Sequence, residues 1–343
     1  MTERTIEGTI LAGERLEPVE GRLVIEDGRI SAIEEASVAS SSIICPTFIN
    51  AHTHIGDSIA KDAGSKLTVE ALFAPPDGLK HQLLRRADSD ELIEAMAATL
   101  RFMQRAGIGA CYDFREGGIE GVEQFRQASA SLELDAIAFG RGDPSVLEVA
   151  DGYGASGAAD GSFEAARNVA LSAEKPFAIH AGEVDSGDIN AALDLDPDFV
   201  VHMVHPEPLH LERIEDMRVP IVCCPRSNLL TGVGTPPIEE LLERTLVALG
   251  TDNVLLNSPS MFREMATMVT VLGVDPLDAL RMATVDAAAI LDRPDGVLEE
   301  GRPARLFVLD GGSDNLVGTV DPIRAVTCRA EVADIDEVSL API

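Results

Sequence analysis

The feature that most limits the possible folds is an alternation of short apolar runs with amphipathic stretches through the middle of the chain. The clear apolar runs are 43–49, 109–114, 135–140, 177–182, 199–204, 221–225 and 245–250. Helical patterns separate them, for example at 89–105, 162–173, 236–243 and 259–270. Strands that alternate with helices indicate a parallel sheet with its helices on the outside.

A weaker apolar run near 151–157 would bring the number of strands to eight. Eight such units predict a closed (β/α)8 TIM-type barrel over residues 46–299, with a doubly wound open sheet as the alternative. Both ends of the chain, 5–35 and 302–331, read as short strands, and Asp27-Gly28 is a hairpin signal. We therefore expect residues 1–45 and 300–343 to form one small β-sandwich domain.

Side chains that can bind a metal stand at the C-terminal ends of these runs, where a parallel barrel carries its active site. His52 and His54 form a His-x-His pair after the first run, and two residues at this spacing point to the same side of an extended chain. His180 ends the run at 177–182, His202 lies in the run at 199–204, and Asp252 follows the run at 245–250. Three or four imidazoles with one carboxylate suit one divalent metal, zinc or alternatively iron.

Glu183 follows His180 by three residues and has the chemistry to shuttle protons, while His202 could orient a water or polarise a substrate. Each feature alone is weak, because a single histidine in an apolar run is commonly a hydrogen-bonded core residue and a Gly-Thr-Asp turn is commonly a cap. Their coincidence at strand ends favours a metal site. His81 and His210 stand in polar surroundings and are expected on the surface; His205 is expected in a loop at the mouth.

Candidate substrate-binding residues follow the predicted strands. Arg115, Arg141 and Arg226 could hold a carboxylate or phosphate, or could pair with nearby acids, and Asn228 also faces the expected mouth. The Gly-rich segment 141–160 and the proline-flanked segment 72–84 are either lids or solvated loops. No phosphate-binding Gly loop or serine nucleophile elbow is present, which argues against phosphoryl transfer and serine hydrolysis.

Charge excludes several classes of partner. The chain has 27 Lys+Arg against 58 Asp+Glu, a net charge of −31, which argues against nucleic acid and anionic membranes. With four lysines in the whole chain, the pattern suits a salt-rich cytoplasm, and we expect a halophilic protein. No signal peptide or apolar span is apparent, and the five scattered cysteines are expected to be reduced, so a cytoplasmic location is predicted.

The chain resembles the amidohydrolase superfamily, specifically its ATZ/TRZ and cytosine-deaminase-like branch. The resemblance is carried, in order along the chain, by CPTFINAHTH, HAGE, VVHMVH, CPRSNLLTGVGTPPIEELL, VALGTDN and DALRMATVDAAAIL. It implies a metal-dependent hydrolase barrel in which His52, His54, His180 and Asp252 bind the metal. It further implies that Glu183 shuttles protons, that His202 contacts the attacking water or the substrate, and that Asp252 also acts as a base.

Binuclear members of this superfamily use a carboxylated lysine after the fourth strand, and the region 141–160 contains no lysine. One metal is therefore expected. The resemblance implies hydrolysis of a C–N bond, most simply deamination of a nucleobase, nucleoside or pterin-like heterocycle. The alternatives are hydrolysis of a cyclic amide or triazine-type ring, and a catalytically silent relative that binds a small molecule. Related enzymes are often dimers or larger, so a homo-oligomer is also considered.

Overall fold

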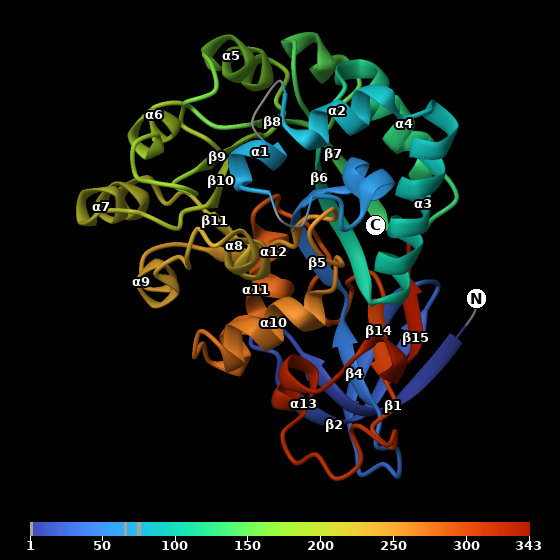
Figure 1. The fold of residues 1–343 in the computed structure, drawn as a ribbon. Coiled ribbons are helices and arrows are strands. Elements are labelled where there is room, and N and C mark those ends of the chain that lie inside the picture. The colour runs from blue at the N-terminus through green and yellow to red at the C-terminus, as the bar shows by residue number, and fades with distance from the viewer. Residues whose placement is uncertain (1–2, 65–66, 74–76) are drawn as a thin grey trace.

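A computed structural model describes residues 3–64, 67–73 and 77–343 and shows two sheets joined by continuous chain (Figure 1). The larger sheet is parallel, and its strands run in the order β12-β11-β10-β9-β8-β7-β6-β5-β13. These strands are β5 (Phe48–His54), β6 (Ile108–Arg115), β7 (Asp135–Gly140), β8 (Gly152–Ala155), β9 (Phe177–Ala181), β10 (Phe199–His202), β11 (Ile221–Cys223), β12 (Val247–Leu249) and β13 (Asp252–Asn253). The predicted parallel sheet is confirmed.

The two edge strands of this curled sheet, β12 and β13, follow each other closely in the chain. β12 pairs with β11, whereas β13, three residues further on, pairs with β5. At the seam, where the end of β12 lies beside β5, the Asn50 side chain replaces backbone pairing. Its Nδ2 donates to Thr251 Oγ1 at 2.7 Å, and its Oδ1 accepts from the Thr251 N–H at 3.0 Å. The backbone ladder is thus interrupted between β12 and β5, where the sequence predicts a closed ring of strands.

Gly250 explains how the seam is so narrow. A Cβ atom at this position would lie 2.7 Å from the Cβ of His52, closer than side chains tolerate. Glycine lets the end of β12 pass directly beside β5. As a result Asp252 is brought next to His52 and His54, the pair that the first strand contributes.

Helices surround the strands (Figure 1). After β5 come the 3₁₀ helix η1 (Ile55–Ala60), α1 (Val69–Phe73), α2 (Leu79–Arg86) and α3 (Ser89–Arg105). Later connections carry α4 (Gly118–Ser129), η2 (Pro144–Glu148), α5 (Glu164–Ser172), α6 (Ile189–Leu193), α7 (Pro208–Met217), α8 (Pro225–Thr231), α9 (Ile238–Leu242), α10 (Met261–Thr270), α11 (Pro276–Ala283) and α12 (Val285–Ala289). In the described part of the chain, no helix combines the length and apolar character needed to cross a membrane.

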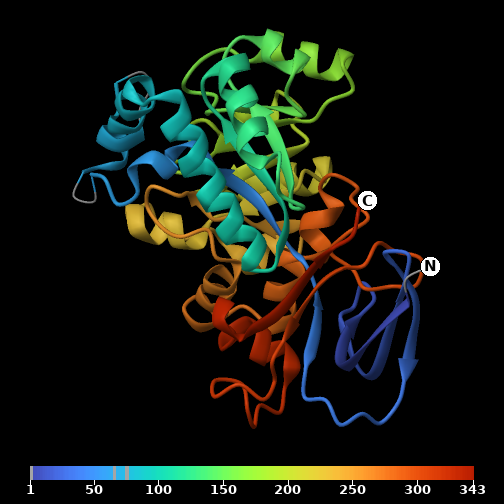
Figure 2. The ribbon, with the colours of Figure 1, turned by 90° about the vertical axis from the view of Figure 1, so that its right-hand side faces the viewer.

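The second sheet is built from both ends of the chain, as predicted, but it is one mixed six-stranded sheet rather than two packed sheets. Its order is β15-β14-β4-β1-β2-β3, and Figure 2 shows the blue N-terminal and red C-terminal strands side by side below the barrel. The strands are β1 (Glu3–Ala12), β2 (Glu17–Glu26), β3 (Arg29–Glu35), β4 (Ile43–Pro46), β14 (Arg305–Leu309) and β15 (Ile335–Leu340). The apolar run at 43–49 is therefore divided between the two sheets.

The expectation of further strands at 302–331 is wrong beyond β14. Residues Pro322–Cys328 form helix α13. The Asp321 side chain accepts hydrogen bonds from the backbone N–H groups of Ile323 and Arg324, and proline stands at the first helical position. An Asp-Pro helix start of this kind outweighs the β-branched composition of the segment.

A buried ionic cluster holds the two sheets together. Asp295 is 1% exposed and accepts from Arg293 Nε at 2.8 Å and from Arg305 Nε at 3.2 Å. Arg305, on β14, also donates to the Gly109 carbonyl of β6 at 2.6 Å. The cluster therefore fixes the N-terminal end of the barrel strands on the terminal sheet.

Replacing Asp295 with alanine is expected to destabilise the protein by about 3–5 kcal/mol, because the buried Arg305 and the partly buried Arg293 lose their shared carboxylate. Urea unfolding in concentrated KCl measures the effect. Asp314→Ala, at an exposed position of the terminal region, serves as the control and should change stability little. Equal stability of the two variants would show that the cluster does not join the sheets.

Candidate metal centre

Three histidines from two non-adjacent strands converge at the C-terminal end of the barrel. His52 and His54 come from β5 and His180 from β9, and their ligating ring nitrogens all lie within 4.8 Å of one another. The Nε2 atoms of His52 and His180 are 3.2 Å apart. The sequence prediction that strand direction brings these residues together agrees with this geometry.

Hydrogen bonds on the outer side of two rings determine which nitrogen faces inward. The Nδ1–H of His54 donates to the Phe114 carbonyl at 3.1 Å, and the Nδ1–H of His180 donates to the Ala155 carbonyl at 2.8 Å. Each Nε2 therefore keeps its lone pair for a ligand on the inner side. The Nδ1 atom of the buried His52 has no hydrogen-bond partner among the described residues, and its Nε2 atom faces that of His180, so this donor set fits a divalent metal.

Burial keeps these imidazoles neutral. It lowers the pKa of His52 to about 4 and that of His54 to about 3, and it also holds the pKa of His180 well below its ordinary value. A neutral imidazole is the form that binds a metal.

Asp252 completes the cluster from β13. Its Oδ1 lies 3.3 Å from His52 Nε2 and 3.6 Å from His54 Nε2, and its Oδ2 accepts from the Ser227 hydroxyl. Burial would raise the pKa of Asp252, but the bond with His52 and the surrounding imidazoles hold it well below its ordinary value. Asp252 is therefore an anion beside three neutral rings.

Glu183 and His202 lie on the other side of the cluster. Glu183 Oε2 is 3.6 Å from His202 Nε2, and the Nδ1–H of His202 donates to Asn228 Oδ1 at 3.1 Å. Burial raises the pKa of Glu183, whose side chain is 27% exposed. The predicted partnership of these two residues agrees with the geometry, and Asn228 orients His202 from behind.

The backbone is strained where these side chains leave their strands. His202 has φ 78°, Met203 has φ 50° and Asp252 has φ 55°, all in the left-handed region. Residues other than glycine adopt this region rarely, and such outliers concentrate at functional sites. The strain turns His202 and Asp252 toward the cavity.

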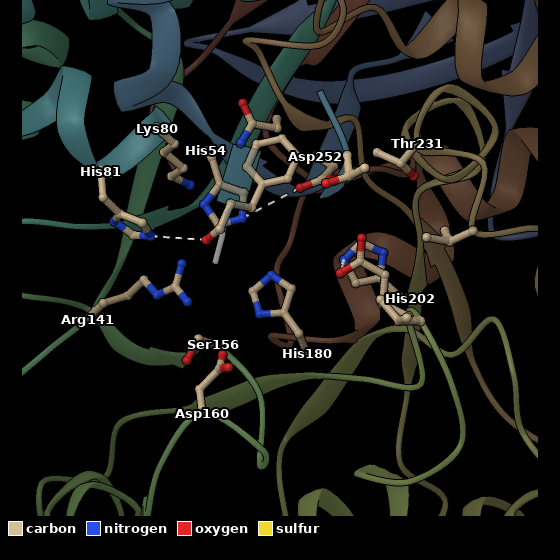
Figure 3. A pocket seen from close by; sticks show the side chains of 16 residues that line it. His54, Lys80, His81, Arg141, Ser156, Asp160, His180, His202, Thr231 and Asp252 are labelled. Carbon is tan, nitrogen blue, oxygen red and sulfur yellow. Dashed lines mark hydrogen bonds and ion pairs between the residues drawn. The ribbon is translucent and has the colours of Figure 1, made fainter. Parts of the chain in front are cut away.

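A cavity of about 570 Å³ opens above the cluster, large enough for a nucleoside-sized molecule. Its walls include His54, His180, Glu183, His202, Asp252, Arg141 and Lys80 (Figure 3). The three-histidine cluster, the carboxylates of Asp252 and Glu183, and the cavity thus lie together at the C-terminal ends of the strands.

The predicted substrate-binding residues divide into two groups. Arg141 lines the cavity. Arg115 is instead buried behind it, with Nη2 2.8 Å from Glu116 Oε2 and Nη1 3.5 Å from Asp113 Oδ2. His205 and Asn228 do not belong to the described lining of the cavity. His205 donates from Nε2 to the Val233 carbonyl at 2.8 Å, and Asn228 accepts a hydrogen bond from His202.

Other arrangements differ from the sequence predictions. His210 is buried and closes a capping box at the start of α7, and His81 is half-buried and lines the cavity, so neither is a plain surface residue. Arg226 pairs with the buried Glu264 rather than facing the mouth freely.

Both predicted lid segments contain regular structure. Segment 141–160 contains η2 and the buried strand β8, so it is not a solvated loop along its length. Segment 72–84 includes the end of α1 and most of α2, and its residues 74–76 lie outside the described part of the chain.

Lys80 is a residue of the site that sequence reasoning missed. Lys80 from α2 is 4% exposed and lies 2.6 Å from Glu116 Oε1 and 3.0 Å from Asp57 Oδ2. Glu116 Oε1 is also 3.2 Å from His54 Nδ1. The available signal was the rarity of lysine: in a chain with four of them, one inside an apolar, proline-flanked segment is unusual.

Histidines and carboxylates that converge at the strand ends of a curled parallel sheet are typical of a metal-dependent hydrolase. Residues 43–335 match the model of the amidohydrolase family, and the chain belongs to that family.

Individual relatives give the same assignment. A protein of Methanothermobacter thermautotrophicus, provisionally described as an aminohydrolase, is 35% identical over 96% of this chain and 95% of its own length. A 5-methylthioadenosine/S-adenosylhomocysteine deaminase of Caldanaerobacter subterraneus is 32% identical over 41% of this chain and 36% of its own. In fold, the zinc complex of the atrazine chlorohydrolase TrzN from Arthrobacter aurescens matches with a TM-score of 0.82 at 20% identity, covering 97% of this chain and 93% of that one.

Proposed function

We propose that this protein is a mononuclear zinc-dependent deaminase of a nitrogen heterocycle of nucleobase, nucleoside or pterin type. The observation that carries the proposal is the placement of two carboxylates around the three-histidine cluster: Asp252 lies within 3.6 Å of the Nε2 atoms of His52 and His54, and Glu183 lines the same cavity beside His202. The surrounding imidazoles hold the pKa of Asp252 well below its ordinary value, whereas burial raises the pKa of Glu183. A paired base and acid of this kind is what hydrolytic deamination requires.

The residues fit one metal ion. His52, His54, His180 and Asp252 would hold it, and a bound divalent ion would supply Lewis-acid activation of water and of the substrate. Lys80, which lines the same cavity, is engaged by Asp57 and Glu116 and does not contribute to a second site of the carboxylated-lysine type. Zinc is preferred to iron because the donors are three neutral imidazoles and one carboxylate.

Each protein group has a distinct task in this reaction. Asp252 accepts the proton of the attacking water, because its carboxylate is anionic. His202, fixed through Nδ1 by Asn228, turns its Nε2 toward the cavity and orients the water or the ring. Glu183 delivers a proton to the ring nitrogen next to the reacting carbon. Its carboxylate then takes the remaining proton of the added hydroxyl group and passes it to the departing amine, which leaves as ammonia, and the proton held by Asp252 returns to Glu183.

The relatives support this reading at the level of class. A deaminase of adenosine derivatives and a chlorohydrolase of a triazine share the family or the fold. Hydrolysis of a triazine-type or cyclic amide ring is the second candidate, since the same acid and base would serve it. The intact set of ligands argues against a catalytically silent relative.

Ammonia release from a panel of amino-heterocycles, measured in concentrated KCl with metal content determined on the same sample, tests the proposal. We expect close to one zinc per chain and ammonia formation from at least one purine, pyrimidine or pteridine. Turnover without ammonia, from a chloro-triazine or a cyclic amide, would favour the second candidate. Fully folded protein that binds no zinc or iron would refute both.

A further inference from the structure

One side of the cavity above the three-histidine cluster is basic. Lys80, His81 and Arg141 form this basic wall, and the lining of the cavity also includes Asp160 and the apolar side chains of Val184 and Val233. Figure 3 shows the three basic side chains together on one side of His54 and His180, with His202 and Thr231 across from them. The chain has 27 basic and 58 acidic residues, so the charge of the basic wall in this cavity is opposite to the net charge of the protein.

Arg141 presents unused donors to the cavity. Its backbone N–H donates to the Arg115 carbonyl at 3.0 Å and its Nη1 donates to Glu116 Oε1 at 2.9 Å, which fixes the start of the side chain and one edge of the guanidinium. The side chain is 17% exposed, and within the described ranges Nε and Nη2 meet no protein acceptor. The guanidinium is a planar fork of five donors that matches a carboxylate.

Lys80 stands beside Arg141 because both bind the same oxygen of Glu116. The Lys80 ammonium uses two of its three protons on Glu116 and Asp57, and one remains for a ligand. A buried ammonium is costly unless it is paired, so this placement indicates a position that the site requires.

The charges of the wall are already balanced by the protein. Lys80, Arg115 and Arg141 face three carboxylates, those of Asp57, Asp113 and Glu116. The wall can therefore accept one negative charge more easily than the two of a phosphate monoester.

We propose that Lys80 and Arg141 form a subsite for a carboxylate carried by the substrate, whose ring lies over the three-histidine cluster. This inference rests on the proposed function, since it names the substituent of the same heterocycle. It makes the substrate an acidic amino-heterocycle, and it makes Arg141 a residue that determines specificity.

Matched pairs of compounds test the subsite: pterin with pterin-6-carboxylate, and adenosine with adenosine-5′-carboxylic acid, with adenosine 5′-phosphate as the phosphate arm. Turnover is measured with the zinc-loaded protein, and binding is measured by calorimetry with the Glu183→Gln variant. We expect the acidic member of at least one pair to be preferred about 100-fold over its neutral partner. Arg141→Met should remove that preference by lowering kcat/KM for the acidic ring about 100-fold.

Arg167→Met provides the matched control, because Arg167 is 15% exposed, is paired with Asp196 and lies on α5 outside this cavity. It should retain the full preference. Equal use and equal binding of acidic and neutral rings by the wild type would overturn the subsite while leaving deamination intact. Preference for the phosphate arm would replace carboxylate by phosphate. Tight binding of an acidic ring without ammonia release from any ring would instead overturn the proposed function and leave the subsite standing.

Discussion

Replacing Glu183 with glutamine is expected to lower kcat by about 10²–10⁴-fold while leaving the bound metal in place. Glutamine has the same shape but cannot deliver a proton to the ring nitrogen. Glu183 Oε2 lies 3.6 Å from His202 Nε2, and Glu183 does not belong to the group of His52, His54 and His180 that could hold the metal. Its replacement therefore leaves the three ligating nitrogens in place. Ammonia release and zinc content, both measured on one preparation, check the prediction.

Glu212→Gln on the exposed face of α7 is the matched control and should keep wild-type turnover. Wild-type turnover in Glu183→Gln would show that another group transfers the proton. Loss of zinc in this variant would show that Glu183 is a ligand rather than an acid.

Replacing Asp252 with asparagine is expected to have the larger effect, a fall in kcat of about 10⁴-fold or more accompanied by weaker zinc binding. The carboxylate lies within 3.6 Å of the Nε2 atoms of both His52 and His54, so it serves the metal, and it is also the proposed base. A neutral amide removes the negative charge from both tasks at once. Zinc affinity is measured by competition with a chelator, and turnover by ammonia release.

Asp194→Asn, an exposed carboxylate paired with Arg213, provides the comparison and should leave both quantities unchanged. An Asp252→Asn protein that binds zinc as tightly as the wild type would restrict Asp252 to the role of base. Together with Glu183→Gln, this variant separates the residue that serves the metal from the residue that serves only the chemistry.

Much of the site follows from local pattern. Apolar runs alternating with amphipathic helices determine a parallel sheet, and in a parallel sheet all strands end on one side. His52, His54, His180 and Asp252 could therefore be placed together before their distances were known. The expected surplus of surface acid is also consistent, since among the described residues only a handful of carboxylates are buried.

Other features depend on packing between distant segments. The apolar run at 43–49 gives no sign that it belongs to two sheets, because both halves are buried and strand-like. The helix α13 was hidden by residues of high β propensity, and its Asp-Pro start decided the outcome. His210 stands among polar residues in the chain, yet it is buried by its capping role.

By itself, the sequence determined the direction of the strands, the side of the sheet that carries the chemistry, and the residues able to bind a metal. These properties repeat along the chain with the period of strands and helices and need no knowledge of contacts. Only the tertiary structure decided that Lys80 joins the site through Glu116, that Arg115 lies behind it and Arg141 within it, and that Asn228 orients His202. The reason is that such contacts join residues from different connections, and no local period specifies which side chains meet when these connections pack over the strand ends.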